Sequence, residues 1–301
     1  MKIHSACYFK DPAADHQFIE QWILRLEKLN NRNYKRFILS TYLGSTVVLS
    51  HNSHKTSLPC LFVFPGFRTS SLFWDLDNGL EVIEDRYRIF LVETNGQPNL
   101  SDGNTPDIKT SDYAQWAGEV IDQLTSEKVS VAGASFGGLI CLKLATEPEK
   151  IQEVFLLNPG CLQPFSLAPK NLYYNLLPII RPTETNVRRF LDKAVFHAPS
   201  HSLSAERMQL IVDYELFALK HHADKAQKPY PMTKAELQRV EVPVHLIVGE
   251  NDMLFPCPRN IKAAQEGLAN LKSVTVIPGT GHGIETSKEA MRAIDSAASK
   301  G

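Results

Sequence analysis

The sequence predicts an α/β protein with a mostly parallel central sheet, helices on both faces of the sheet and a helical cap inserted between two strands. In the first half of the 301-residue chain, short apolar runs rich in β-branched residues alternate with helical patterns. Alternating strands and helices are typical of parallel sheets. The alternation stops over residues 160–241, where helical patterns follow one another, and then resumes. We therefore expect residues 1–159 and 242–301 to form one core and residues 160–241 to form the cap.

An extra helix is expected near residues 15–30, before the first strand. Its apolar side chains recur at helical spacing: Phe18, Trp22, Leu26 and Leu29. A β-hairpin is expected next, with strands 37–41 and 46–50 joined through Gly44.

The core elements that follow are read from apolar runs and their flanking turn residues. We expect strand 61–64, a helix near 72–83, strand 87–92, a helix near 111–125, strand 129–132, helix 139–145 and strand 153–157. After the cap come strand 244–248, helix 259–271 and strand 274–277. All the loops at the carboxyl ends of these strands should meet at one edge of the sheet.

The cap region is predicted to be helical at 185–193, 204–220 and 233–240. The last helix begins with a capping box formed by Thr233 and Glu236. The stretch 162–180 is richer in aromatic and apolar residues than a polar linker requires. Its side chains either roof a substrate site or attach the cap to the core, since both tasks use the same residue types.

Composition favours a cytoplasmic protein that acts on small molecules. The chain is 43% hydrophobic and 22% charged, with a net charge of −1, so it has no strong field for nucleic acid or an anionic membrane. It has no evident signal peptide and no apolar segment long enough to span a membrane. The sequence marks no oligomer interface.

The cysteines and histidines do not suggest a metal site. The five cysteines have no paired spacing, which argues against disulfides and a zinc site: Cys7, Cys60, Cys141, Cys161 and Cys257. The pairs His197/His201 and His221/His222 lack nearby carboxylates or cysteines at ligand spacing. We expect no metal and no organic cofactor.

A serine between two glycines stands where a strand passes into a helix. Gly133-Ala134-Ser135-Phe136-Gly137 follows the apolar strand 129–132 and precedes a helical run. A sharp strand-to-helix turn exposes a serine hydroxyl and brings backbone N–H groups near it. A flexible turn is the alternative for these five residues alone, but the flanking strand and helix favour a nucleophile at Ser135.

A carboxylate and a histidine follow in the order that such a serine requires. Asp252 lies in the loop after strand 244–248, and His282 lies in the glycine-rich loop after strand 274–277. Histidine titrates near neutrality and can take the serine proton, while a carboxylate orients the ring. Asp252 could instead be a surface turn residue, with Glu250 as the competing carboxylate.

The loop after strand 61–64 is the expected second part of an oxyanion hole. Gly66 lets the chain turn toward the nucleophile after Pro65. We assign the two donors to the backbone N–H groups of Phe67 and Phe136, although an ordinary Pro-Gly turn is the alternative.

Together these motifs resemble the α/β-hydrolase family over nearly the whole chain. The resemblance rests on Gly133-x-Ser135-x-Gly137, on Pro65-Gly66-Phe67, on Gly249-x-x-Asp252-x-x-x-Pro256 and on Gly281-His282. The chain is similar to small cap-bearing bacterial serine hydrolases related to esterases and meta-cleavage-product hydrolases. Pro65 stands where the family usually has histidine.

The motifs and the resemblance imply a serine hydrolase with a Ser135–His282–Asp252 triad and an acyl-enzyme. The expected substrate is a carboxylic ester, lactone or thioester with an apolar part, bound by Phe67, Phe136, Phe165 and Tyr173. The alternatives are a carbon–carbon bond hydrolase or an acyltransferase of the same fold, or a ligand receptor with low turnover.

Overall fold

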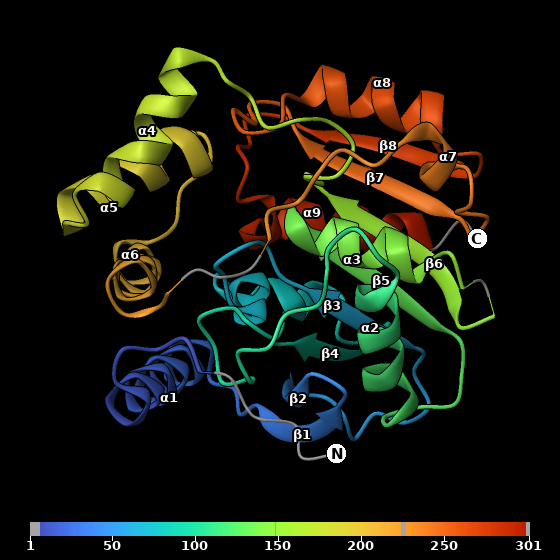
Figure 1. Cartoon of the computed structure of the whole chain (residues 1–301), viewed down its shortest axis with the longest axis horizontal. Coiled ribbons are helices and arrows are strands. Elements are labelled where there is room, and N and C mark those ends of the chain that lie inside the picture. Colours follow the sequence, from blue (N-terminus) through green and yellow to red (C-terminus); the bar gives the residue numbers. More distant parts are fainter. Residues whose placement is uncertain (1–6, 148, 224–226, 299–301) are drawn as a thin grey trace.

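The centre of the fold is an eight-stranded sheet with the strand order β1-β2-β4-β3-β5-β6-β7-β8 (Figure 1). The computed structural model describes residues 7–147, 149–223 and 227–298. The strands are β1 (Lys35–Thr41), β2 (Gly44–Ser50), β3 (Cys60–Phe64), β4 (Arg88–Val92), β5 (Val129–Ala134), β6 (Ile151–Leu157), β7 (Val244–Gly249) and β8 (Leu271–Ile277).

The sheet is antiparallel only at its β1 end. β1 pairs with β2 and β2 pairs with β4 in antiparallel fashion, whereas every later pair is parallel. Parallel strands need helical crossovers, which place all their carboxyl ends at one edge. The loops after β3, β5, β6, β7 and β8 therefore converge there, and the predicted α/β fold with a mostly parallel sheet is confirmed.

Helices cover both faces of the sheet and give it two hydrophobic cores. On one face, α2 (Asp112–Asp122), α3 (Phe136–Leu144) and α8 (Cys257–Gly267) share a core with β3, β5, β6 and β7. On the other face, α9 (Lys288–Ala298) packs with the segment that follows β3. The central strands β3 and β5 are buried along their whole length, as helices on both sides require.

Among the described residues between β6 and β7 there are four helices and a π-helical turn. They are α4 (Pro169–Ile180), α5 (Glu184–Phe190), the π-helical turn η3 (Leu191–Val195), α6 (Ala205–His221) and α7 (Lys234–Leu237). Figure 1 shows α4, α5 and α6 together at one side of the sheet. The segment that contains them, called the inserted segment below, begins and ends at the neighbouring strands β6 and β7.

The N-terminal helix α1 (Pro12–Asn30) packs against the inserted helix α6. The indole N–H of Trp22 donates to the backbone oxygen of Leu210 at 2.8 Å, and Trp22 is buried. Arg25 and Asp213 form an ion pair at 2.8 Å beside it. α1 therefore fixes α6 in place.

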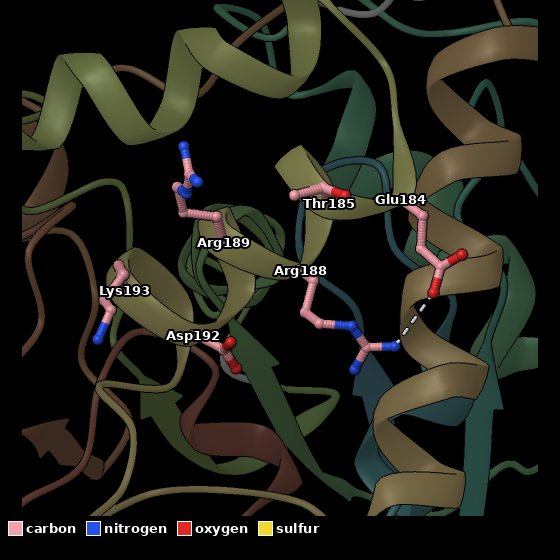
Figure 2. A pocket seen from close by; sticks show the side chains of 6 residues that line it. All are labelled: Glu184, Thr185, Arg188, Arg189, Asp192 and Lys193. Carbon is pink, nitrogen blue, oxygen red and sulfur yellow. Dashed lines mark hydrogen bonds and ion pairs between the residues drawn. The ribbon is translucent and has the colours of Figure 1, made fainter.

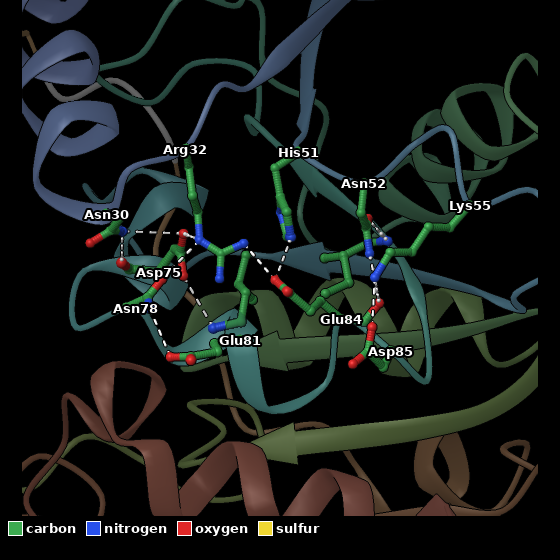
Figure 3. Close-up of polar contacts among 12 residues, drawn as sticks. Asn30, Arg32, His51, Asn52, Lys55, Asp75, Asn78, Glu81, Glu84 and Asp85 are labelled. Carbon is green, nitrogen blue, oxygen red and sulfur yellow. Dashed lines mark hydrogen bonds and ion pairs between the residues drawn. The ribbon is translucent and has the colours of Figure 1, made fainter.

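A polar network fastens the end of α1 to the segment after β3 (Figure 3). The guanidinium of Arg32 binds the Glu84 carboxylate at 2.6 Å and the buried Asp75 carboxylate at 3.2 Å. Tyr34 also donates to Asp75, and His51 binds Glu84 at 2.9 Å. Burial raises the pKa of Asp75, and Arg32 acts in the opposite direction by stabilising the charged carboxylate. Both carboxylates of the network, Asp75 and Glu84, are therefore paired, as buried charges require.

Four local sequence predictions differ from the structure. The helix expected near 72–83 is wrong, because two 3-10 turns, η1 (Ser71–Asp75) and η2 (Gly79–Val82), take its place. Asn78 between them has a left-handed φ of 54°, which ends a right-handed helix. The Asp75 carboxylate accepts the N–H of Leu80 at 3.1 Å and stabilises the turn. α4 has no counterpart among the predicted helices. α7 is shorter than the predicted helix 233–240, and α8 ends before residue 271, the predicted end of its helix, because β8 starts there.

No helix among residues 7–147, 149–223 and 227–298 has the length and apolar character needed to cross a bilayer.

Replacing Gly137 with alanine is expected to lower the free energy of unfolding by about 3 kcal/mol. A Cβ at this position would lie 2.1 Å from the backbone oxygen of Phe64, so α3 would have to move away from β3. Chemical denaturation measures the loss. Gly118→Ala is the matched control, because its Cβ would meet only the flexible Lys150 amine at 3.6 Å. That control should gain about 0.5–1 kcal/mol from helix propensity, and equal stability of the two variants would refute the steric argument.

Candidate active site

Ser135 occupies the turn between β5 and α3 in a strained backbone conformation. Its φ is 50° and its ψ is −108°, a region that residues with a side chain rarely adopt. The turn is tight, because a Cβ on Gly133 would lie 2.3 Å from the backbone of Gly137. The backbone N–H of Ser135 donates to the Leu157 oxygen at the end of β6, which holds the turn at the carboxyl edge of the sheet.

The structure joins His282 to Asp252. The Nδ1 atom of His282 lies 2.8 Å from one carboxylate oxygen of Asp252. The other oxygen accepts the backbone N–H groups of Leu254 and Phe255 at 2.8 and 3.0 Å. The Asp252 side chain is fully buried, whereas 11% of the His282 side chain is exposed. This carboxylate holds the ring by Nδ1 and leaves Nε2 available as a base.

Glu250, the competing carboxylate, has a different partner. It accepts the backbone N–H of Gly279 at 2.9 Å, at the start of the loop that carries His282. Glu250 is therefore a loop anchor in this structure, and the carboxylate bound to the histidine is that of Asp252.

The charge of His282 is controlled by burial and by two acids. Burial lowers the pKa of His282, but the charge and hydrogen bond of Asp252 raise it, as does the charge of Glu285, and the net shift is upward from 6.5. Burial raises the pKa of Glu285, and His282 opposes this. Glu285 lies three residues beyond the histidine and belongs to no motif visible in the sequence.

Asn158, which no sequence motif singled out, joins the loops that carry Asp252 and His282. Its side-chain nitrogen donates to the backbone oxygens of Gly281 and His282 at 2.9 and 3.0 Å. Its side-chain oxygen accepts the N–H of Gly249 at 2.8 Å. The residue is fully buried at the end of β6, with a left-handed φ of 41°. The sequence shows only the position of Asn158, directly after the predicted strand 153–157.

Asn158→Ala is expected to lower the free energy of unfolding by about 3 kcal/mol, because three buried backbone groups lose their partner. The looser histidine loop should also lower kcat/KM for an ester about 10- to 100-fold. Denaturant titration and steady-state kinetics measure the two effects. Asn270→Ala is the control, since Asn270 makes one exposed bond to the Glu241 oxygen. Indistinguishable values for the two variants would contradict the positioning role of Asn158.

The two predicted oxyanion donors lie beside Ser135. A Cβ on Gly66 would lie 3.6 Å from the Ser135 Cβ, so the loop that carries Phe67 adjoins the serine. The rings of Phe67 and Phe136 meet edge to face at 6.0 Å. Neither backbone N–H donates to another residue in the part of the chain that the structure describes. Phe136 is the first residue of α3, where backbone N–H groups have no partner within the helix.

The aromatic residues predicted to bind substrate occupy two different environments. Phe165 contacts Phe255, whose ring lies 5.5 Å from the His282 ring. Tyr173 is 53% exposed on α4 and contacts Tyr174. Phe165 thus belongs to an apolar group next to the histidine, whereas Tyr173 lies largely in solvent.

The hydroxyl of Ser135 makes no hydrogen bond to another described residue. Within the described ranges, no three His, Cys, Asp or Glu side chains are grouped closely enough to hold a metal ion.

A hollow of about 300 Å³ lies on the inserted segment, over α5 and η3 (Figure 2). Its lining side chains are mostly charged: Glu184, Thr185, Arg188, Arg189, Asp192 and Lys193. Arg188 pairs with Glu184 at 3.3 Å on its rim. The hollow shares no residue with the predicted site.

Comparisons with known proteins show the family of the chain. Residues 60–293 match the model of the alpha/beta hydrolase family, well over half of the chain. The chain belongs to the alpha/beta hydrolase family. The matched range contains the loop of Gly66, the turn of Ser135, and both Asp252 and His282.

Relatives and solved structures are bacterial hydrolases. The chain is 25% identical over 254 residues to a protein named "Uncharacterized carboxylesterase nap" of Bacillus subtilis, covering 82% of this chain and 80% of the relative. It is 23% identical to carboxylesterase YbfK of the same organism, over 73% and 72% of the two chains. The structure of the B. subtilis naproxen esterase superimposes with a TM-score of 0.80 and 22% identity, covering 95% and 98% of the two chains. Named relatives of this kind support a hydrolase enzyme.

Proposed function

We propose that the protein hydrolyses carboxylic esters, lactones or thioesters by acyl transfer through Ser135. His282 Nε2 takes the proton from Ser135 Oγ as the oxygen attacks the carbonyl carbon. The Phe67 and Phe136 N–H groups stabilise the oxyanion, each by about 3 kcal/mol. His282 then gives its proton to the leaving oxygen or sulfur, and an acyl-enzyme remains. Water, deprotonated by His282, attacks the acyl carbonyl; as the bond to Ser135 Oγ breaks, His282 returns the proton to Oγ, so that the carboxylic acid leaves and the serine is regenerated.

The Asp252–His282 contact, together with the strained Ser135 turn, carries this proposal. A carboxylate on Nδ1 fixes the tautomer in which Nε2 can accept a proton, and it stabilises the imidazolium that forms. The missing Ser135–His282 bond does not weigh against it, since such bonds often form only when substrate is present. The carboxylesterase names of the relatives support the choice of an ester carbonyl.

In this proposal, residues 160–241 form a cap over a core made of residues 1–159 and 242–301. The loop of His282 contacts the inserted segment directly, because the N–H of Gly283 donates to the Val195 oxygen at 3.0 Å. Phe165 and Phe255 supply an apolar wall beside the histidine. The apolar part of the substrate is placed against this wall.

A fluorophosphonate probe tests the proposal together with hydrolysis of p-nitrophenyl butyrate. We expect one adduct per chain, mapped by mass spectrometry to the peptide that contains Ser135, and loss of ester hydrolysis in step with labelling. Hydrolysis without labelling, or an adduct at another residue, would overturn the assignment. Labelling at Ser135 without turnover of esters, lactones or thioesters would favour a ligand receptor instead.

A further inference from the structure

Arg68 places a positive charge one residue beyond the proposed oxyanion donor Phe67. Its backbone has a left-handed φ of 59°, and its N–H donates to the side-chain oxygen of Gln97 at 2.6 Å. The guanidinium carbon lies 6.0 Å from the centre of the Phe67 ring. Arg68 and Gln97 are therefore locked together at the edge of the proposed carbonyl site.

Both side chains carry buried donors that have no acceptor. Arg68 Nε and Gln97 Nε2 are buried, and neither has a hydrogen-bond partner. Gln97 is only 2% exposed. No acidic side chain of the described residues forms an ion pair with Arg68. A buried donor without a partner costs about 1–3 kcal/mol, so two of them on residues that are bonded to each other indicate a place where a bound group supplies the acceptors.

The facing helix α6 supplies no such acceptor at bonding distance. Burial raises the pKa of Glu215 and the nearby charge of Arg68 opposes this, with a net value of about 7. Burial and the charge of Arg68 together lower the pKa of His222 to about 4. Residues seven apart lie on one side of a helix, so the guanidinium is close to one side of α6 near its end. Glu215 is 7% exposed, and its carboxyl group has no hydrogen bond to a described residue.

We propose that Arg68 and Gln97 bind a carboxylate on the non-reacting end of the substrate, so that the enzyme prefers monoesters of dicarboxylic acids to neutral esters. This inference rests on the proposed function, because the position of Phe67 fixes where the reacting carbonyl lies. A carboxylate offers two acceptor oxygens, and the planar guanidinium binds such groups through charge-assisted bonds. The single negative charge of a monoester carboxylate is matched by the positive charge of Arg68. A group with two negative charges would leave one charge unmatched near Glu215.

The test compares monomethyl with dimethyl esters of succinic, glutaric and adipic acids by following acid release. For the best chain length, we expect wild-type kcat/KM to be at least tenfold higher for the monoester. Arg68→Met should lower the monoester-to-diester ratio about 10- to 100-fold. Gln97→Glu should also lower it, since its carboxylate still accepts the Arg68 N–H but repels the substrate anion. Arg188→Met, which removes a partly exposed arginine of α5, is the matched control and should keep the wild-type ratio.

Two results would overturn the subsite and leave the ester hydrolase standing. The first is a wild-type ratio near one with measurable hydrolysis of diesters. The second is an equal ratio for Arg68→Met, Gln97→Glu and the Arg188→Met control. If Arg68→Met does not fold, as judged by its thermal transition, Gln97→Glu decides alone. Failure to hydrolyse either series, with no fluorophosphonate adduct, would instead refute the proposed function and this inference with it.

Discussion

Ser135→Ala is expected to lower kcat for a p-nitrophenyl ester about 10⁶-fold, the largest loss among the variants considered. The alanine has no oxygen that can attack the carbonyl, so no acyl-enzyme forms. The residual rate comes from the Phe67 and Phe136 N–H groups and from substrate binding. Single-turnover kinetics with the purified variant measures the loss of activity. The fluorophosphonate adduct should also be absent from this variant.

The same experiment checks that the triad acts as a unit. The double variant Ser135→Ala/His282→Ala should be about as slow as either single variant, because groups that act in one step are not additive. Ser130→Ala is the matched control, since Ser130 lies on the same strand and donates to Glu153 at 3.0 Å, away from the site. Unchanged hydrolysis by Ser135→Ala would end the serine mechanism.

The sequence predicts the core better than the inserted segment, and the reason is physical. A buried parallel strand is a short continuous apolar run, which Cys60–Phe64 and Val244–Gly249 both display. α4 lacks that kind of signal. Leu176, Ile179 and Ile180 of α4 are all about half exposed or more, so their hydrophobic pattern does not mark a buried face.

Turn chemistry limited the prediction near residues 72–83. The apolar run Leu72-Phe73-Trp74 suits a helix, but Asn78 turns the chain with a positive φ. The side chain of Asp75 then binds both Leu80 and Arg32, a residue far away in the sequence. Long-range partners of this kind override local helix propensity, and a single sequence does not reveal them.

For the site, chain order and loop position predicted which residues lie at one edge of the sheet. Because the strands before Ser135, Asp252 and His282 are parallel, their following loops share that edge. The choice between Asp252 and Glu250 needed the structure, since both are acids in the same loop. Asn158 was missed because a buried asparagine acts through backbone groups of other loops, and those contacts leave no local sequence pattern.

Asp252→Asn is expected to lower kcat about 10⁴-fold while leaving the fold in place. The amide can donate a hydrogen bond to Nδ1, which stabilises the tautomer with the proton on Nε2 and so blocks proton transfer from Ser135. Asparagine also lacks the negative charge that stabilises the imidazolium. Steady-state kinetics over a range of pH measures both effects.

The pH profile distinguishes this role from a structural one. In the wild type, the pKa of His282 is raised above 6.5, so kcat/KM should fall as pH drops through a value above 6.5 and the ring becomes protonated. Without the Asp252 charge, burial dominates and lowers the pKa of His282, so this acid limb should move to lower pH. Glu250→Gln is the matched control, because a glutamine oxygen can still accept the Gly279 N–H. An acid limb that stays in place in Asp252→Asn would mean that another group controls the charge of His282.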